Sequence, residues 1–214
     1  MLGVIVTAGK PLSDITIDHV LGLDGPRSST FILSHLRCLI QWTQGQAAKP
    51  LHASFADYLT DAHRCDSQPW FIDVSVHHEL LAIRCFQIMK AGLKFNICDL
   101  ETSYVSNDNI YDLNDHIKNH IPVHLAYACH FWGDHLQKTN FTPTVLSNVD
   151  DFLSHWLLFW LEVLSLVKEV QIASPALLSI ADWTLVGTSI KNLTCRWLRC
   201  SANSIFPSIT MKKL

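Results

Sequence analysis

The chain has 214 residues, of which 49% are apolar and 16% are charged, and its net charge is −3. This length suits one large domain or two small ones. The charge disfavours a nucleic-acid partner, because residues 1–65 carry five basic and five acidic side chains and offer no basic face to phosphates. Since soluble surfaces usually carry more charge, we expect some apolar faces to contact a partner, either another domain or another copy of the chain.

Cysteine usage and the apolar segments indicate a cytoplasmic protein. The seven cysteines are irregularly spaced without a C-x-x-C pair, which is typical of reduced thiols. Cys85 and Cys129 fall at apolar positions of helical patterns and are predicted to fill the core. The chain starts without a basic leader, and its most apolar segment, residues 156–167, is too interrupted for a membrane span.

Residues 1–65 are predicted to form short helices and a β-hairpin. An apolar run over residues 2–6 comes first, Ser13 caps a second helix that Gly22 ends, and a third helix starts at Pro26. Residues 39–42 form a strand, residues 43–49 a turn and residues 50–52 the returning strand. These are the parts of a winged helix. The side chains expected to face inward on the second and third helices are Ile15, Ile17, Val20, Leu21, Phe31, Ile32, His35, Leu36 and Leu39.

A short helix is expected after the hairpin. Ser54 and Asp57 have the S-x-x-D spacing of a capping box, and Phe55, Tyr58 and Leu59 share one face. The periodicity then breaks at residues 65–69, which indicates a linker.

Residues 70–183 have an almost wholly helical pattern. Helices are predicted over about residues 76–89, 112–121, 124–137 and 148–170, and a last one has Pro175 in its first turn and runs to Trp183. Residues 99–109 are polar and loop-like, and residues 184–214 are expected to be a divergent, poorly ordered tail. The predicted fold class is mainly α: a winged-helix module with a small hairpin at residues 1–65, followed by an α-helical array at residues 70–183.

The histidine-rich segments lack the spacing of a metal or catalytic site. His77, His78 and Glu79 are adjacent and do not share a helix face, so a solvated helix N-terminus is favoured over a metal site. His130 and Asp134 are four residues apart and are expected to form a partly buried polar pair. No G-x-S-x-G elbow is present in the sequence. We predict no catalytic residues, no bound metal and no enzyme activity.

Two tryptophans leave an alternative open. Trp156 and Trp160 lie four residues apart and belong either to the core or to an exposed patch that faces a missing neighbouring domain.

Several segments point to a known family when they are taken in order. They are Leu51-His-Ala-Ser-Phe-Ala-Asp-Tyr-Leu59, Trp70-Phe-Ile-Asp73, His77-His-Glu-Leu-Leu-Ala-Ile-Arg-Cys-Phe86, Lys94-Phe-Asn-Ile-Cys98, Tyr127-Ala-Cys-His-Phe-Trp-Gly-Asp-His-Leu136, Trp160-Leu-Glu-Val-Leu-Ser-Leu166 and Ala173-Ser-Pro-Ala-Leu-Leu178. No single segment is specific, but their order over roughly residues 2–183 resembles the region after the NACHT nucleotide-binding domain in fungal (basidiomycete) STAND-type NTPases, which are NLR-like proteins.

The resemblance implies a winged helix and a helical array from an ATP- or GTP-driven oligomerising switch. In such proteins the histidine of the L-H-x-S-F type contacts the bound diphosphate and helps hold the resting state, and His52 is the matching position. The family's NACHT domain and sensor repeats are missing. None of the eight glycines begins G-x-x-x-x-G-K-[ST], and Pro11 occupies the place of a Mg²⁺-binding hydroxyl in the nearest approach.

The sequence therefore favours a non-catalytic regulatory segment of a fungal NACHT-type signal-transducing NTPase that lacks the nucleotide-binding domain. Its expected partner is a protein, either a NACHT domain or a full-length family member, with no nucleic acid and no membrane. No cofactor is expected in isolation, because His52 would sense nucleotide only in the context of a NACHT domain. The alternative is a stand-alone helical protein-interaction module, or an inert truncated relative, that binds full-length family members.

Overall fold

The computed structural model of the protein describes residues 1–23, 28–65, 68–102 and 104–187. Over these ranges the chain is mainly helical and contains one small antiparallel sheet of two strands. The predicted fold class, mainly α with a small hairpin, is thus confirmed at this level.

The N-terminal unit contains three short helices and the hairpin. Its elements are α1 (Leu2–Thr7), α2 (Asp14–Leu21), α3 (Ser29–His35), β1 (Ile40–Gln41) and β2 (Lys49–Pro50). In the hairpin, Ile40 lies opposite Pro50. The link between α1 and α2 joins the sheet through an isolated antiparallel bridge from Ser13 to Ala47, so three chain segments meet at this edge.

Both predicted boundaries of α2 are confirmed. The Ser13 side chain accepts a hydrogen bond from the Thr16 amide (3.3 Å), and Gly22 ends the helix in the left-handed conformation at φ 64° and ψ 45°. The predicted start of the third helix, Pro26, lies outside the described residues, and α3 begins at Ser29.

The inward faces of α2 and α3 differ in part from the prediction. Ile17 and Val20 are buried, whereas Ile15 is exposed. On α3 the buried apolar side chain is Leu33, and Phe31 is 62% exposed. The prediction was wrong for Phe31, Ile32 and His35 because α3 turns Leu33 inward instead. Leu39 lies beyond this helix, which ends at His35, so helical spacing does not apply to it.

A buried carboxylate holds the N-terminal unit together. Asp14 is 1% exposed. Its Oδ1 accepts a hydrogen bond from the Gly45 amide in the hairpin turn (2.9 Å), and its Oδ2 accepts one from Thr30 Oγ1 on α3 (3.1 Å). Ser29 Oγ donates to the Asp14 carbonyl (2.9 Å). Because a buried charge needs such partners, Asp14 fixes the hairpin turn relative to α2 and α3.

Two short helices connect this unit to the helical array. They are α4 (Ala53–Thr60) and α5 (Ala62–Cys65). The array consists of α6 (Val74–Gly92), the 3-10 turn η2 (Asn107–Asn109), α7 (Leu113–His120), α8 (Val123–Gln137), α9 (Pro143–Asp151), the π-helical turn η3 (Phe152–Trp156), α10 (Leu157–Leu166), the 3-10 turn η4 (Val170–Ile172) and α11 (Ala173–Gly187).

The predicted helices at residues 76–89, 112–121 and 124–137 correspond to α6, α7 and α8. The helix predicted at residues 148–170 begins earlier, because Thr142 caps α9 and Pro143 occupies its first turn. It ends earlier too, before Lys168, which has a left-handed φ of 60°. Helix α11 runs past Trp183 to Gly187, and the rest of the predicted tail, residues 188–214, lies outside the described residues.

Helix α8 is central to the core. Its Trp132 ring lies 5.0 Å from the Phe152 ring and 5.5 Å from the Trp160 ring, measured between centroids, and all three side chains are buried. Trp160 Nε1 donates to the Cys129 carbonyl on α8 (2.8 Å). Trp160 is therefore a core residue, whereas Trp156 is half-buried. The predicted burial of Cys129 and Cys85 is confirmed.

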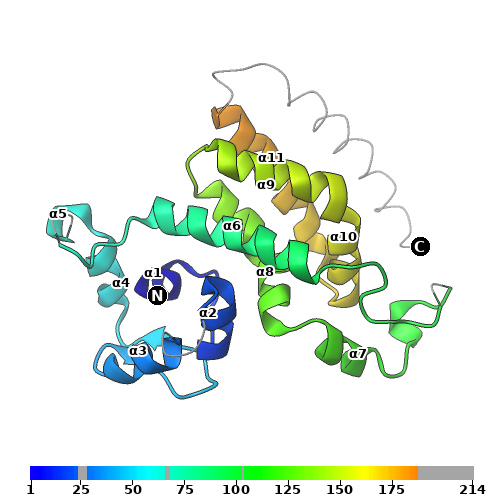
Figure 1. Ribbon diagram of the computed structural model, residues 1–214, viewed down its shortest axis with the longest axis horizontal. Coiled ribbons are helices and arrows are strands. Elements are labelled where there is room, and N and C mark those ends of the chain that lie inside the picture. The colour runs from blue at the N-terminus through cyan, green and yellow to red at the C-terminus, as the bar shows by residue number, and fades with distance from the viewer. Residues whose placement is uncertain (24–27, 66–67, 103, 188–214) are drawn as a thin grey trace.

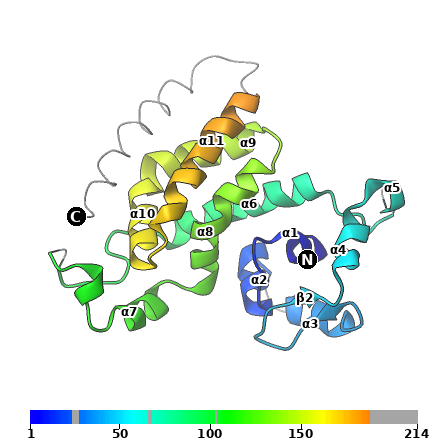
Figure 2. The same ribbon diagram turned by 180° about the vertical axis from the view of Figure 1, so that it is seen from behind.

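The helices are arranged on the two sides of the α6–α8 pair. Figures 1 and 2 show the N-terminal unit on one side and α9, α10 and α11 on the other. Helices α1 and α2 contact α6, and α11 packs on α8. That packing is close at Gly133, where an added Cβ would lie 3.0 Å from the Ala176 Cα.

Candidate functional site

His52, the predicted nucleotide-sensing residue, is exposed and forms the N-cap of α4. Its Nδ1 accepts a hydrogen bond from the Ser54 amide (3.1 Å) and lies 2.7 Å from Ser54 Oγ. Because Nδ1 accepts from a backbone amide, the neutral imidazole carries its proton on Nε2. This Nε2–H has no partner among the residues that the structure describes, so it is available to donate to an external acceptor.

The predicted capping box of Ser54 and Asp57 is wrong. Helix α4 begins one residue before Ser54, and His52 supplies the cap in its place. Asp57 lies one turn inside the helix and lines a cavity between α4 and α8. Of the three side chains expected on one apolar face, Leu59 is buried but Tyr58 is 37% exposed.

Exposed leucines lie beside His52 on the hairpin. The Leu51 amide donates to the Leu39 carbonyl (2.9 Å), so the two residues are cross-strand neighbours. Because side chains alternate along a strand and Ile40 is buried, Leu39 faces outward, and it and Leu51 are both exposed. We call Leu39 and Leu51 the hairpin face. His52 follows this face directly in the chain.

The predicted solvated helix N-terminus at His77 and His78 is a further error. Helix α6 begins at Val74 after the Asp73 cap, so these residues lie in its second turn, where α6 packs on α1 and α8. His78 is 3% exposed, and its Nδ1 lies 2.8 Å from Nδ1 of His135 on α8. His77 packs against α1, where Gly3 leaves room for the ring.

The histidine pair belongs to a chain of buried hydrogen bonds whose proton positions can be assigned. Tyr127 Oη accepts from the Gly9 amide (3.3 Å) and lies 2.8 Å from His135 Nε2. If His135 also donated to this oxygen, the buried tyrosine proton would have no partner, so Tyr127 donates to Nε2. His135 then carries its proton on Nδ1 and donates to Nδ1 of His78. The His78 proton is consequently on Nε2.

Burial keeps this network neutral. Among the causes that lower the pKa of His78 to about 4 and that of His135 to about 3, burial is the largest. The positive charge of Lys138 and a neighbouring imidazole lower each pKa further. Burial also raises the pKa of the Tyr127 hydroxyl, which therefore stays a donor. At pH 7 the pair contains two uncharged rings.

The pair borders a cavity of about 410 Å³ between the N-terminal unit and the helical array. Its walls come from the end of α1 and the residues after it, and from α4, α6 and α8. Three charged side chains line it: Asp57 on α4, Asp134 on α8 and Lys138, the residue that caps the C-terminal end of α8. Within the described ranges, none of the three has an ion-pair or hydrogen-bond partner. The cavity therefore contains charges of both signs that form no ion pair or hydrogen bond with the described part of the protein.

His130 pairs with a different carboxylate from the one predicted. Its Nδ1 lies 2.6 Å from Glu169 Oε2, and both side chains are partly exposed. Asp134, one turn further along α8, is exposed and turned to the cavity instead. The prediction of a partly buried polar pair is right for His130 and wrong for its partner, because Glu169 approaches from the segment after α10.

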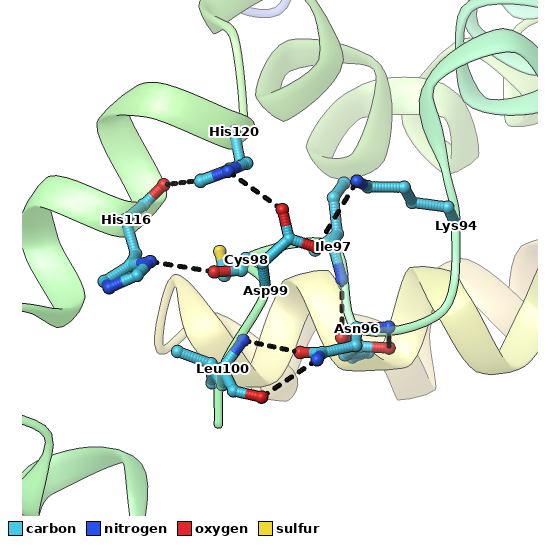
Figure 3. Close-up of polar contacts among 9 residues, drawn as sticks. Lys94, Asn96, Ile97, Cys98, Asp99, Leu100, His116 and His120 are labelled. Carbon is cyan, nitrogen blue, oxygen red and sulfur yellow. Dashed lines mark hydrogen bonds and ion pairs between the residues drawn. The ribbon is translucent and has the colours of Figure 1, made fainter. Parts of the chain in front are cut away.

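A second polar cluster holds the loop between α6 and α7 (Figure 3). The Asn96 side chain exchanges two hydrogen bonds with the Leu100 backbone (both 2.9 Å). Asp99 contacts His120 (3.2 Å) and Lys94 (3.6 Å). From α10, Glu162 accepts hydrogen bonds from two successive amides of the loop, those of Asn96 (3.3 Å) and residue 97 (3.1 Å).

Two residues of this loop have left-handed backbones. Asn96 has φ 48° and Asp99 has φ 49°, a conformation that these residue types tolerate. His116 of α7 contacts the Cys98 carbonyl (2.8 Å). Because the polar groups of the cluster pair with one another, we interpret it as a structural brace of α7 against α10.

The arrangement of possible metal ligands and the burial of two thiols can be stated for the described part of the chain. No three His, Cys, Asp or Glu side chains there are grouped closely enough to hold a metal ion. Burial raises the pKa of the Cys85 and Cys129 thiols, so they stay protonated and unreactive. None of the helices in the described ranges is long and apolar enough to cross a bilayer.

Sequence reasoning missed the buried network, although one signal for it exists. Tyr127 and His135 are eight residues apart, which places them on one face of α8 among apolar neighbours. His78 comes from a position 57 residues away, and no spacing rule connects it to that face.

The comparisons with known proteins add no relative from which a role could be transferred. No family model matches the chain, and neither a curated protein nor a solved structure matches it.

Proposed function

We propose that this chain is a non-catalytic regulatory segment of a fungal NACHT-type signal-transducing NTPase. Its winged helix and helical array would control a nucleotide-binding domain, whose phosphate-loop motif does not occur in these 214 residues. The geometry of His52 carries the proposal, because the α4 cap holds Nδ1 as an acceptor and directs a free Nε2–H outward. We place the protein in the cytoplasm, a location that the unpaired thiols of Cys38, Cys65 and Cys85 favour.

The N-terminal unit supports the winged-helix part of the proposal. A winged helix needs three helices and a hairpin, and a third extended segment often pairs with the hairpin. Here the link between α1 and α2 makes that pairing, through the bridge from Ser13 to Ala47 and a hydrogen bond from the Ala48 amide to the Leu12 carbonyl (2.8 Å). His52 follows the returning strand, where it would lie next to a docked domain.

In the proposed mechanism, Nε2–H of His52 donates to a phosphate oxygen of a diphosphate bound by the NACHT domain. A hydrogen bond to a charged acceptor is worth about 1.5–3 kcal/mol, which shifts a two-state equilibrium roughly tenfold to a hundredfold. One donor does not offset the cost of capturing a free nucleotide. The sensor role therefore requires the partner domain, which would contact the hairpin face beside His52.

The test measures diphosphate release from a partner NACHT domain. A NACHT domain from a fungal family member is loaded with fluorescent ADP, and its dissociation rate is measured with and without this chain. We expect the wild-type chain to slow release and His52→Asn to lose about a tenfold to hundredfold effect. Asparagine is a preferred N-cap residue, so this variant keeps α4 while it removes the outward Nε2–H.

The matched control is His63→Ala, since His63 is an exposed imidazole on α5 outside the cap. It should slow ADP release as the wild type does. If His52→Asn also retains the full effect, His52 is not a sensor. If the wild-type chain neither binds the NACHT domain nor changes release, the regulatory proposal fails as a whole.

A second candidate is a stand-alone helical module that binds full-length family members. Leu158 on α10 and Leu178 on α11 favour it, because they are 75% and 55% exposed on the array, away from the hairpin. In this case Leu158→Lys and Leu178→Lys should abolish capture by a full-length family member, and His52→Asn should not. The opposite pattern would favour the first candidate.

A further inference from the structure

The cavity between the N-terminal unit and the helical array contains one buried donor whose direction is fixed. The hydrogen bonds from Tyr127 through His135 leave the proton of His78 on Nε2, and His78 lines the cavity. Within the described residues, the only side-chain nitrogens that are fully buried and lack a hydrogen-bond partner belong to the indoles of Trp42, Trp132 and Trp156. Nε2 of His78 also lacks a described partner but is not one of these atoms, so it is not fully buried. Nε2 of His78 therefore keeps access to the cavity, although the residue as a whole is 3% exposed.

The charges in the cavity wall define the ligand further. Lys138 supplies a positive charge beside the histidine pair, because its amide donates to the His135 carbonyl (3.1 Å) and it lines the same cavity. Asp57 and Asp134 supply two negative charges, and none of the three side chains forms an ion pair or hydrogen bond with a described residue. A simple anion would meet the two carboxylates, and a simple cation would meet the lysine. A small molecule that carries both charges matches both kinds of group.

We propose that this cavity binds a small zwitterion of the α-amino-acid class. The carboxylate of the ligand accepts hydrogen bonds from Lys138 Nζ and His78 Nε2–H, and its ammonium group faces Asp57 and Asp134. The volume of about 410 Å³ lies within the range of about 300–1,000 Å³ that small-molecule sites occupy. This site is separate from the His52 cap and does not depend on the function proposed above.

Binding at this place joins the two parts of the protein. Asp57 comes from α4, which follows the hairpin, whereas Asp134 comes from α8 in the array and Lys138 from the C-cap of that helix. A ligand that contacts all three holds α4 against α8. It also stabilises the folded protein, because it binds the assembled cavity and not the unfolded chain.

The first experiment measures the thermal unfolding midpoint of the full chain at pH 7 with each standard amino acid in turn. Acetate and methylammonium, added at the same concentrations, each supply one half of the proposed ligand. We expect at least one amino acid to raise the midpoint in a saturable way and neither single-charge probe to do so. The proposal is overturned if no amino acid raises the midpoint, or if acetate or methylammonium raises it as much.

The second experiment assigns the effect to this cavity by calorimetric titration of the active amino acid. Lys138→Met and Asp57→Asn should each weaken binding about tenfold to a hundredfold. Both side chains are exposed, so the variants should fold, and their circular dichroism spectra check this. Lys49→Met is the matched control, because Lys49 is an exposed lysine without an ion-pair partner in the described ranges. Wild-type affinity in Lys138→Met, or an equal loss in Lys49→Met, places the ligand elsewhere and refutes the assignment.

Discussion

Acid should destabilise this protein through the buried histidine pair, and His78→Asn should remove about half of that effect. Burial lowers the pKa of His78 to about 4 and that of His135 to about 3 in the folded protein, whereas an imidazole in the unfolded chain has a pKa of about 6.5. Between these values the unfolded state binds more protons than the folded state. The stability that the neutral histidine pair contributes is therefore fully present above about pH 7 and is lost as the pH falls below 6.5.

The expected magnitude follows from these pKa values. An imidazole that stays neutral in the folded protein lowers the unfolding free energy by about 1.36 kcal/mol for each pH unit below 6.5, or by about 2 kcal/mol at pH 5. Two such rings lower it by about 4 kcal/mol, a large part of the 5–15 kcal/mol or so that stabilises a typical domain. Burial also lowers the pKa of His77 and His124, so the difference between variant and wild type is the informative quantity.

Urea unfolding followed by tryptophan fluorescence at pH 7.5, 6.5, 5.5 and 5.0 measures this difference. The wild type should lose about 2 kcal/mol more than His78→Asn between pH 7.5 and 5.0. The asparagine amide can take the place of His78 Nδ1 beside His135 and does not titrate. His63→Asn, which changes an exposed ring, should follow the wild type. A wild-type stability that is constant over this range, or an unchanged slope in His78→Asn, would refute the assignment of a neutral buried pair.

Two further predictions concern packing. Asp14→Ala should lower the unfolding free energy by about 2–3 kcal/mol, because the Gly45 amide and the Thr30 hydroxyl lose their acceptor; urea unfolding measures the loss, and hydrogen exchange should show faster exchange at Gly45. Gly133→Ala should lower the free energy by about 1–3 kcal/mol, since the new Cβ would lie 3.0 Å from the Ala176 backbone. A thermal midpoint equal to that of the wild type would contradict this close approach of α8 and α11.

The helix boundaries that could be predicted from the sequence are set by residues whose side chain or conformation fixes the backbone beside them. Ser13 and Gly22 bound α2 through a side-chain oxygen and a left-handed conformation, and Pro122 and Pro175 mark helix ends and starts through the fixed proline ring. The cap of α4 was mispredicted because histidine is not among the usual N-cap residues, and the more familiar S-x-x-D pattern that starts two residues later, at Ser54, was favoured.

The candidate site could not be predicted from spacing because its members meet through tertiary packing. His78 and His135 come from two helices, and Asp14 contacts a turn and a helix that follow it in the chain. For His130 the spacing within α8 suggested Asp134, but Glu169 lies closer in space. Periodicity describes one helix face at a time, whereas these contacts depend on which faces meet.

The π-helical turn η3 has a consequence for how this chain can change. It lies between α9 and α10 in one unbroken helical run, residues 143–166. A π-turn contains one more residue than an α-turn, and each residue rotates an α-helix by about 100°. The extra residue therefore sets the rotation of α10 about its own axis. This rotation points Trp160 into the same core as Phe152. A single-residue deletion there would swing the indole of Trp160 out of the interior, so this stretch tolerates exchange of a side chain better than loss of a position.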